Sequence, residues 1–275
     1  MTSPQAPVGR LAVCATPIGN LEDVTIRVLD ALRAADLVAC EDTRHTRALL
    51  ARHGISARAV SLHEHNERSR ASELLERMRS GATVALVCDA GTPLVSDPGF
   101  TLVRACVQAG IEVQALPGPS AVLAALVVSG LPCERWRYVG FLPRARGQLG
   151  ELLAGATDTL VAFESPARLA GTLEQLAAQD PARPVAVCRE LTKLHEEVRR
   201  GAASELAVHY RQQPARGEVA LVVGAAQAGR APLQGALAAV RELIDAGAKP
   251  RSAAAAVAKL TGLRANELYR EITKL

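Results

Sequence analysis

The chain has 275 residues, of which 49% are hydrophobic and 22% are charged. This balance is typical of globular proteins and excludes a mainly disordered, collagen-like or disulfide-stapled chain. No apolar run approaches the roughly 18 residues that cross a membrane, so we expect no membrane partner. The net charge is +4, and residues 235–275 hold seven Lys or Arg against four Asp or Glu. A basic excess at one end suggests a polyanionic partner.

The length exceeds that of a common single domain, so we expect two compact units and an appendage. The six cysteines are widely spaced and form no CxxC pair. That pattern argues against a zinc ribbon and favours buried thiols in a reducing compartment. The first ten residues lack the basic start and apolar stretch of a secretion signal, so we expect a cytoplasmic protein.

The first unit, residues 1–117, alternates short apolar runs with amphipathic stretches. Helical periodicity covers 22–34 and 67–79, where apolar side chains recur on one stripe. Strands are predicted over 11–15, 36–40, 58–62, 83–88 and 111–116. Strands that read as continuous apolar runs between helices indicate an α/β domain with a sheet covered on both faces.

The second unit, residues 118–224, begins with a predicted helix that has Gly118 near its cap and Pro119 at its first position. Strands are predicted over 138–142, 159–163, 184–188 and 218–223. This order is compatible with either an α/β or an α+β unit. Residues 225–235 are small and polar and are predicted to be a linker. Residues 236–275 show three short helical patterns and no strand, which predicts a small helical domain.

Polar and turn-forming residues follow nearly every predicted strand. They are Thr16 to Asn20, Glu41 to Thr46, His63 to Glu67, Asp89 to Pro93, Ser96 to Gly99, Pro117 to Ser120, Glu164 to Pro166 and Arg189 to Lys193. Ligands of α/β sheets bind at the carboxyl ends of strands, so these loops together predict a ligand cleft. Each loop taken singly can be an ordinary turn, and Asp97 before Pro98 looks like a helix N-cap.

Several familiar sites are missing. The chain has no GxGxxG, no GxxxxGK[ST] and no GxSxG, which disfavours a Rossmann dinucleotide site, a P-loop and a hydrolase nucleophile. His63, His65 and Glu67 have no HExxH context, so no metal is expected. The glycine in the loop from Asp89 to Pro93 lets the main chain approach an adenosine or amino-acid group closely.

Long motifs in fixed order carry a resemblance to a known family. They are TPIGNLEDVTIRVLDAL, CEDTRHTRALLARHGI, LHEHNE, VALVCDAGTPLVSDPGFTLVRAC, ALPGPSAVLAAL, YVGFLPR, FESPARL and CRELTKLHEE, and the match runs from about Leu11 to Leu275. They resemble the tetrapyrrole methylase superfamily, and within it the bacterial enzymes that methylate a cytidine 2′-hydroxyl of 16S ribosomal RNA.

This resemblance implies two α/β subdomains that hold S-adenosylmethionine in the cleft between them, and usually a homodimer. The implied substrate is the small ribosomal subunit, methylated on the ribose of cytidine 1402 near its decoding centre. The cofactor-binding positions implied are Pro17, Gly19, Asp89, Ala90, Gly91, Thr92, Pro93, Pro117, Gly118 and Ser120. One departure is Ala167, where the family often has histidine. A catalytic role of that histidine does not carry over to this chain.

Methyl transfer to a ribose hydroxyl requires alignment and help with proton loss. The candidates at strand ends are Glu190, Lys193, Glu41, Asp42 and His45. We expect Glu190 and Lys193 to act together, because a carboxylate three residues away can hold an ammonium near the attacking oxygen. The alternative is an ordinary surface ion pair.

Contacts with RNA phosphates favour arginine, whose fork pairs with phosphate oxygens. The candidates are Arg44, Arg47, Arg144, Arg146, Lys249 and Arg251. Aromatic residues lie among the arginines of 135–146, although these rings can equally fill the core of the second unit. Two other functions remain open: a methyltransferase acting on a tetrapyrrole such as a cobalamin or sirohaem precursor, and an RNA-binding protein without catalysis.

Overall fold

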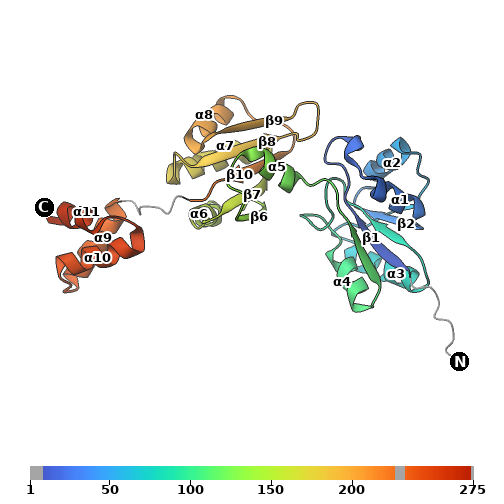
Figure 1. Ribbon diagram of the computed structural model, residues 1–275, viewed down its shortest axis with the longest axis horizontal. Coiled ribbons are helices and arrows are strands. Elements are labelled where there is room, and N and C mark those ends of the chain that lie inside the picture. Colours follow the sequence, from blue (N-terminus) through green and yellow to red (C-terminus); the bar gives the residue numbers. More distant parts are fainter. Residues whose placement is uncertain (1–8, 227–232, 274–275) are drawn as a thin grey trace.

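A computed structural model describes residues 9–226 and 233–273. Along the chain these residues form two sheet-containing units and a separate helical unit (Figure 1). No helix among these described residues combines the length and apolarity that crossing a bilayer requires.

The first unit is built on a parallel five-stranded sheet. Its strands β1 (Arg10–Cys14), β2 (Leu37–Cys40), β3 (Ala59–Ser61), β4 (Val84–Leu86) and β5 (Glu112–Leu116) lie in the order β3-β2-β4-β1-β5. All of their pairings are parallel. The five predicted strands are therefore present, and their carboxyl ends lie at one edge of the sheet.

Helices cover both faces of this sheet, as the continuous apolar strands predicted. The core on one face includes side chains of α1 (Ile26–Ala34) and α2 (Thr43–Arg52). The core on the other includes side chains of α3 (Glu67–Arg79) and α4 (Phe100–Gln108). The first predicted helix is interrupted, because a short 3-10 turn, Leu21–Asp23, precedes α1 and the Thr25 hydroxyl caps α1 at Val28 N.

The second unit has a mixed sheet. Its strands are β6 (Trp136–Phe141), β7 (Thr159–Glu164), β8 (Pro184–Arg189), β9 (Glu197–Ala202) and β10 (Val219–Val223), in the order β6-β7-β10-β8-β9. Only β6 and β7 pair in parallel, and the other three pairings are antiparallel. The sequence left open whether this unit is α/β or α+β. Its sheet is mixed, with both parallel and antiparallel pairings.

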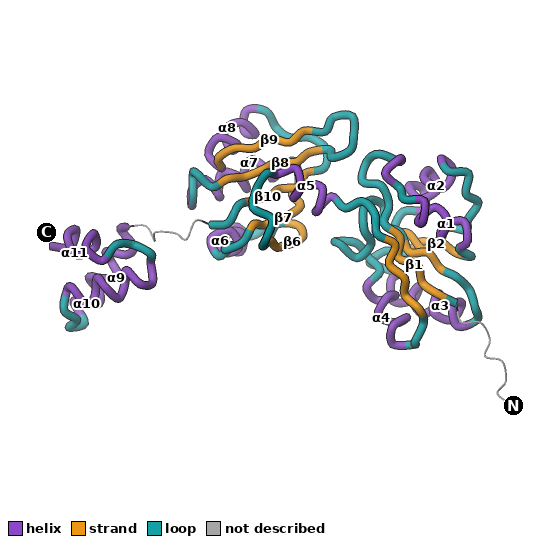
Figure 2. Tube along the Cα trace, in the orientation of Figure 1, coloured by secondary structure: helices purple, strands orange, loops and turns teal. Residues whose placement is uncertain are grey.

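The helices of this unit also divide between two faces. Helix α5 (Ala121–Ser129) packs on one face, and α6 (Arg146–Ala154), α7 (Pro166–Gln179) and α8 (Ala203–Gln212) pack on the other. In Figure 2 the teal segment that follows β5 leads from the first sheet into α5 on the second. The predicted boundary at residue 117 lies directly after β5.

Two predicted caps are wrong. Helix α5 begins at Ala121 with Ser120 as its N-cap, whose hydroxyl accepts a hydrogen bond from Leu123 N at 3.5 Å, so Pro119 is not its first residue. Helix α4 has Gly99 as its N-cap. Its first turn is held instead by Glu67, whose carboxylate accepts hydrogen bonds from Gly99 N and Thr101 N at 2.9 Å. Asp97 is therefore free for another role.

The C-terminal unit consists of α9 (Leu233–Asp245), α10 (Pro250–Thr261) and α11 (Ala265–Thr273). Val240, Val257 and Leu268 lie in its own hydrophobic core. Most of the predicted linker at 225–235 lies outside the described residues, namely 227–232. The three helical patterns of the sequence therefore correspond to three helices with a common core.

Candidate active site

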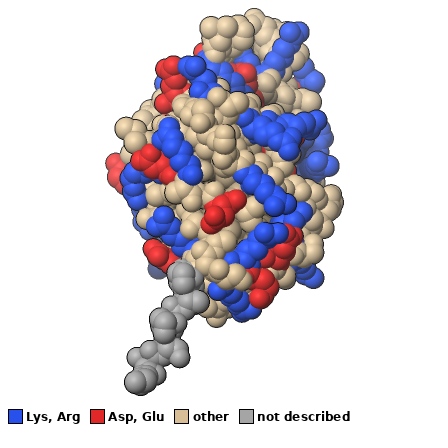
Figure 3. Space-filling model, turned by 90° about the vertical axis from the view of Figure 1, so that its right-hand side faces the viewer, with Lys and Arg blue, Asp and Glu red and all other residues tan. Residues whose placement is uncertain are grey.

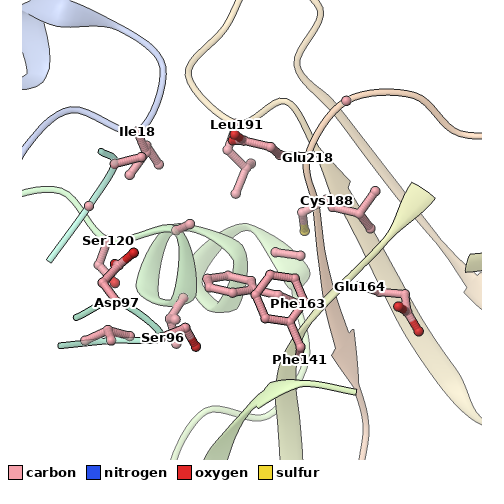
Figure 4. Close-up of a pocket in the computed structure, with 18 of the residues that line it drawn as sticks. Ile18, Ser96, Asp97, Ser120, Phe141, Phe163, Glu164, Cys188, Leu191 and Glu218 are labelled. Carbon is pink, nitrogen blue, oxygen red and sulfur yellow. The ribbon is translucent and has the colours of Figure 1, made fainter. Parts of the chain in front are cut away.

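An apolar cavity of about 330 Å³ lies between the first and second units. The first unit contributes Ile18 and the loop after β4, and the second contributes Ser120, Phe163, Cys188 and Ala220 (Figure 4). Its volume lies within the usual range of small-molecule sites. Its described lining contains three carboxylates, Asp97, Glu164 and Glu218, and no Lys, Arg or His.

Three loops predicted to bind a cofactor meet at this cavity. Thr16 N donates to Gly91 O at 2.8 Å and Gly91 N donates to Thr16 O at 3.0 Å. The Thr92 hydroxyl donates to Pro119 O at 3.1 Å. Gly91 has φ +85°, and a side chain there would start 3.4 Å from Ile18. Glycine therefore keeps the main chain of this loop open to the cavity.

A second, more polar cavity of about 300 Å³ adjoins the first. Its lining includes Thr16, Pro17, Gly19, His45, Asp89 and Lys193. Ile18, Ala90 and Glu218 line both cavities. A ligand in the apolar cavity and a ligand in the polar cavity would consequently meet across these three residues.

His45 and Asp89 form a pair in the polar cavity. His45 Nδ1 lies 3.2 Å from Asp89 Oδ2, while Asp89 Oδ1 accepts a hydrogen bond from Asp42 N at 3.0 Å. Asp89 follows β4 and His45 lies in the first turn of α2. A carboxylate that holds one ring nitrogen fixes the orientation of the other, which is the arrangement of a general base.

Lys193 lies between two carboxylates. Its Nζ is 3.0 Å from Glu190 Oε1 and 3.0 Å from Glu218 Oε2, and 28% of its side chain is exposed. Burial alone would lower the pKa of Lys193, but hydrogen bonds to Glu218 and Glu190 raise it above its ordinary value. Lys193 therefore stays an ammonium at neutral pH and serves as a cation rather than a base.

Glu190 holds Lys193 in place without lining either cavity. Its Oε1 also accepts a hydrogen bond from Glu218 N at 2.8 Å. That bond and Lys193 together hold the pKa of Glu190 below its ordinary value. The backbone is in the left-handed region at Glu190 (φ +48°) and Thr192 (φ +66°). Such unfavourable conformations in non-glycine residues concentrate at functional sites.

The loop that carries Lys193 rests on the first loop of the other unit. Asn20 N donates to the Thr192 hydroxyl at 3.1 Å. A Cβ atom on Gly19 would lie 2.8 Å from that hydroxyl oxygen and 3.0 Å from Leu191 O. Gly19 therefore permits a close contact between the two units at the polar cavity.

Other predicted site residues lie outside both cavities. Asp42 caps α2 at Arg44 N and pairs with the Arg44 guanidinium at 2.6 Å, which lowers the pKa of Asp42. Burial, and then the charge of Asp89, raise the pKa of Glu41. Pro93, Pro117, Gly118 and the departing residue Ala167 also line neither cavity.

The predicted RNA-binding residues are exposed at three separate places. Arg44 and Arg47 lie on α2, Arg144 and Arg146 lie at the start of α6, and Lys249 and Arg251 lie at the start of α10. Arg251 stacks over the Tyr269 ring at 5.3 Å. Figure 3 shows the face at the end of the first unit, where basic and acidic side chains are interspersed instead of forming one basic field.

Sequence reasoning missed the aromatic wall and Asp97. Tyr138 and Phe141 both make edge contacts with Phe163, with centroids 5.3 and 5.6 Å apart. The strand-end rule includes the segment Ser96 to Gly99, but Asp97 before Pro98 also fits the pattern of a helix cap, and that interpretation hides its place in the cavity lining.

Residues 10–207 match the model of the Tetrapyrrole (Corrin/Porphyrin) Methylases. The chain belongs to this family. A relative in Mycobacterium tuberculosis (strain CDC 1551 / Oshkosh) is 46% identical over 269 residues, which cover 95% of this chain and 93% of the relative. A relative in Escherichia coli O157:H7 is 42% identical, covering 95% and 94%. Both are named ribosomal RNA small subunit methyltransferase I.

Solved structures of this tetrapyrrole methylase fold agree with the architecture. Uroporphyrin-III C-methyltransferase from Thermus thermophilus covers 78% of this chain and 94% of its own, at TM-score 0.57 and 23% identity. The cobalamin biosynthetic enzyme cobalt precorrin-4 methyltransferase covers 82% and 98%, at TM-score 0.60 and 18% identity. At these identities the likeness concerns the fold, and the named relatives identify the chain as a methyltransferase.

Proposed function

We propose that this enzyme transfers a methyl group from S-adenosylmethionine to the 2′-hydroxyl of a cytidine in 16S ribosomal RNA of the small subunit. The names of relatives that share 42–46% of their residues over most of the chain support the substrate class. The observation that carries the chemistry is the pair of adjoining cavities, one apolar and one polar, with a common boundary at Ile18, Ala90 and Glu218.

The apolar cavity fits S-adenosylmethionine by its chemistry. The open main chain at Gly91 and Thr92 would hold the polar parts of the donor, and Ile18, Phe163 and Ala220 offer apolar surface to its adenosine. A lining that contains carboxylates and no basic side chain suits a cationic ligand. When bound, this cofactor supplies a methyl group that its sulfonium already makes electrophilic.

The polar cavity then receives the ribose. His45 takes the proton of the 2′-hydroxyl at Nε2, while Asp89 holds Nδ1. Lys193, fixed by Glu190 and Glu218, directs a positive charge to the oxygen as it loses its proton. Alignment of two bound reactants can contribute roughly 7–11 kcal/mol, and a positioned base about 10² to 10⁴ in rate. Orientation across the shared boundary is thus the larger effect.

The exposed basic residues on α2, α6 and α10 bind phosphates of the substrate. Arg47, Arg144 and Arg146 have no ion-pair partner among the described residues. Arg44 keeps 85% of its side chain exposed although it pairs with Asp42.

Since ribosomal subunits are the substrate, this function also places the enzyme in the cytoplasm.

The enzyme also acts as a homodimer in this proposal. Helix α5 carries two exposed apolar side chains, Leu123 at 51% and Val127 at 80% exposure. A self-association surface would cover such residues. Sedimentation of the wild type and of Val127→Asp checks this: a dimer that becomes a monomer is the expected result, and a monomeric wild type contradicts it.

The test of the function is transfer of labelled methyl from S-adenosylmethionine to three acceptors. These are small subunits lacking the modification, subunits already modified, and a porphyrinoid. Label in the ribose of one cytidine of the unmodified subunits is the expected result, with none in modified subunits. Label in the porphyrinoid alone would support a tetrapyrrole methyltransferase, and binding of RNA without any transfer would support a non-catalytic protein.

A further inference from the structure

The three carboxylates that line the apolar cavity differ in their partners. Glu164 accepts hydrogen bonds from Ser165 N at 2.7 Å and the Thr172 hydroxyl at 2.6 Å, and pairs with Arg168 at 3.3 Å. Glu218 pairs with Lys193 at 3.0 Å. Asp97 pairs with no cation among the described residues, and its neighbour is the Cys88 thiol. One negative charge of this cavity is therefore left without a counter-ion.

The backbone around Asp97 aims this loop at the cavity. Leu94 and Ser96 are both in the left-handed region, with φ +72° and +69°. The Ser96 hydroxyl is held by Tyr138 Oη at 2.6 Å, which ties the loop to β6 of the second unit. Figure 4 shows Asp97 near Ser120 on one side of the cavity and the rings of Phe141 and Phe163 on another. Strained residues and a cross-unit hydrogen bond thus fix where the carboxylate stands.

Aromatic rings and a half-buried carboxylate line the same cavity, and both kinds of group attract cations. The negative faces of aromatic rings attract cations, and most strongly those without a tight hydration shell. A carboxylate in a partly desolvated wall attracts the same charge more strongly than in water. The methyl donor carries a sulfonium, whereas its product, S-adenosylhomocysteine, has a neutral thioether at that atom.

We infer that Asp97 is the counter-ion of the donor's sulfonium and lets the enzyme distinguish S-adenosylmethionine from S-adenosylhomocysteine by charge. This rests on the proposed function, because it takes S-adenosylmethionine as the donor. The consequence is product release: once the methyl group has left, the charge that Asp97 attracts is gone.

The charge on Asp97 depends on pH near neutrality. Burial, followed by the negative charges of Glu41 and Asp89, raises its pKa to about 6, although the Cys88 thiol acts in the opposite direction. Tyr138, from β6, also faces it, and Asp97 contributes to the raised pKa of that phenol. Below the pKa the carboxyl is neutral, so binding of the sulfonium weakens as the pH falls from 7.5 to 5.

The test is calorimetric binding of S-adenosylmethionine, S-adenosylhomocysteine and sinefungin, which carries an amine in place of the sulfonium. In Asp97→Asn we expect affinity to fall about tenfold for the two ligands with a positive charge at the sulfur position, and to change less than about twofold for S-adenosylhomocysteine. The control is Asp158→Asn, which removes a charge directly before β7, at the strand end remote from Glu164 and outside both cavities, and should leave all three affinities unchanged. The preference of the wild type for S-adenosylmethionine over S-adenosylhomocysteine should decrease as the pH falls toward 5. Asp97→Asn should show no such pH dependence.

Three outcomes overturn the inference. An equal loss for all three ligands would assign Asp97 to the amino-acid ammonium that they share. Unchanged affinities with lost methyl transfer would assign Asp97 to binding of the acceptor. If Asp97→Asn keeps the wild-type preference for S-adenosylmethionine over S-adenosylhomocysteine, Asp97 has no role in charge recognition. Failure of the wild type to bind S-adenosylmethionine at all is a different result, which refutes the proposed donor itself.

Discussion

The two cavities share a boundary but differ in what lines them. The apolar cavity is lined by main chain at Gly91, aromatic rings and strand residues of the second sheet. The polar cavity is lined by polar and charged side chains that hold one another, His45 with Asp89 and Lys193 with Glu218. In the proposed function this difference separates donor binding from proton transfer in space. Substitutions in one cavity should therefore change donor affinity, and substitutions in the other should change turnover.

The sharpest test of this separation is His45→Ala. We expect turnover to fall about 10²- to 10⁴-fold, because the hydroxyl loses its positioned base. Donor affinity should stay within about twofold, since His45 lines only the polar cavity. Single-turnover methyl transfer and calorimetric donor binding measure the two quantities. His65→Ala, an exposed histidine outside both cavities, is the control, and turnover in His45→Ala within threefold of wild type would refute the assignment.

Replacing Lys193 or Glu190 should give the next largest effect. Lys193→Met removes the cation beside the reacting oxygen, and we expect turnover to fall about 100-fold. Glu190→Gln weakens the ion pair that holds Lys193 in position, and we expect turnover to fall about tenfold. Donor affinity should change little in either variant. Arg211→Met, which breaks an exposed ion pair with Glu174 on the far helices, serves as the comparison. If both variants retain wild-type turnover, the pair is only a surface ion pair.

Gly19→Ala should disturb the contact between the first loop of one unit and the Lys193 loop of the other, rather than the lining of a single cavity. The new methyl group would press on Leu191 O and Thr192 and displace the loop that carries Lys193. We expect turnover to fall about tenfold and the free energy of unfolding to fall by about 1–3 kcal/mol. Gly147→Ala in α6 has open space around the added atom and should be neutral or stabilising. Denaturant titration and turnover decide, and a Gly19→Ala enzyme equal to wild type in both would contradict the contact.

The helical unit should contribute the smallest effect, on RNA affinity alone. Lys249→Ala with Arg251→Ala should weaken subunit binding about tenfold and make it less dependent on salt, because two phosphate contacts are lost. Filter binding at several salt concentrations checks this, and altered donor affinity would contradict it.

The fold was largely predictable because several of its strands are fully buried. Val84 to Leu86 and Val219 to Val223 are buried along their whole length, so both appear as unbroken apolar runs. Strand β9 was missed, since Glu197 to Ala202 form an edge strand with exposed Arg199 and Arg200. Its pairing with β8 is set by the tertiary structure rather than by its own hydrophobicity.

The site was predictable in its loops but not in its contacts. The strand-end rule located Gly91, Ser120, His45 and Lys193. The partner of His45, the second carboxylate on Lys193 and the role of Asp97 depend on distances between loops that are remote in sequence. Asp97 in particular satisfies the local pattern of a helix cap, and only the capping of α4 by Glu67 releases it.

The most direct measurement is a crystal structure of the enzyme with S-adenosylhomocysteine and a cytidine-containing oligonucleotide. The account predicts the cofactor product in the apolar cavity, its sulfur near the boundary at Ile18 and Ala90 and on the side that faces Asp97. It predicts the ribose of the cytidine in the polar cavity, with its 2′-oxygen within hydrogen-bonding distance of His45 Nε2. A cofactor product in the polar cavity, or a ribose bound away from His45, would contradict the account.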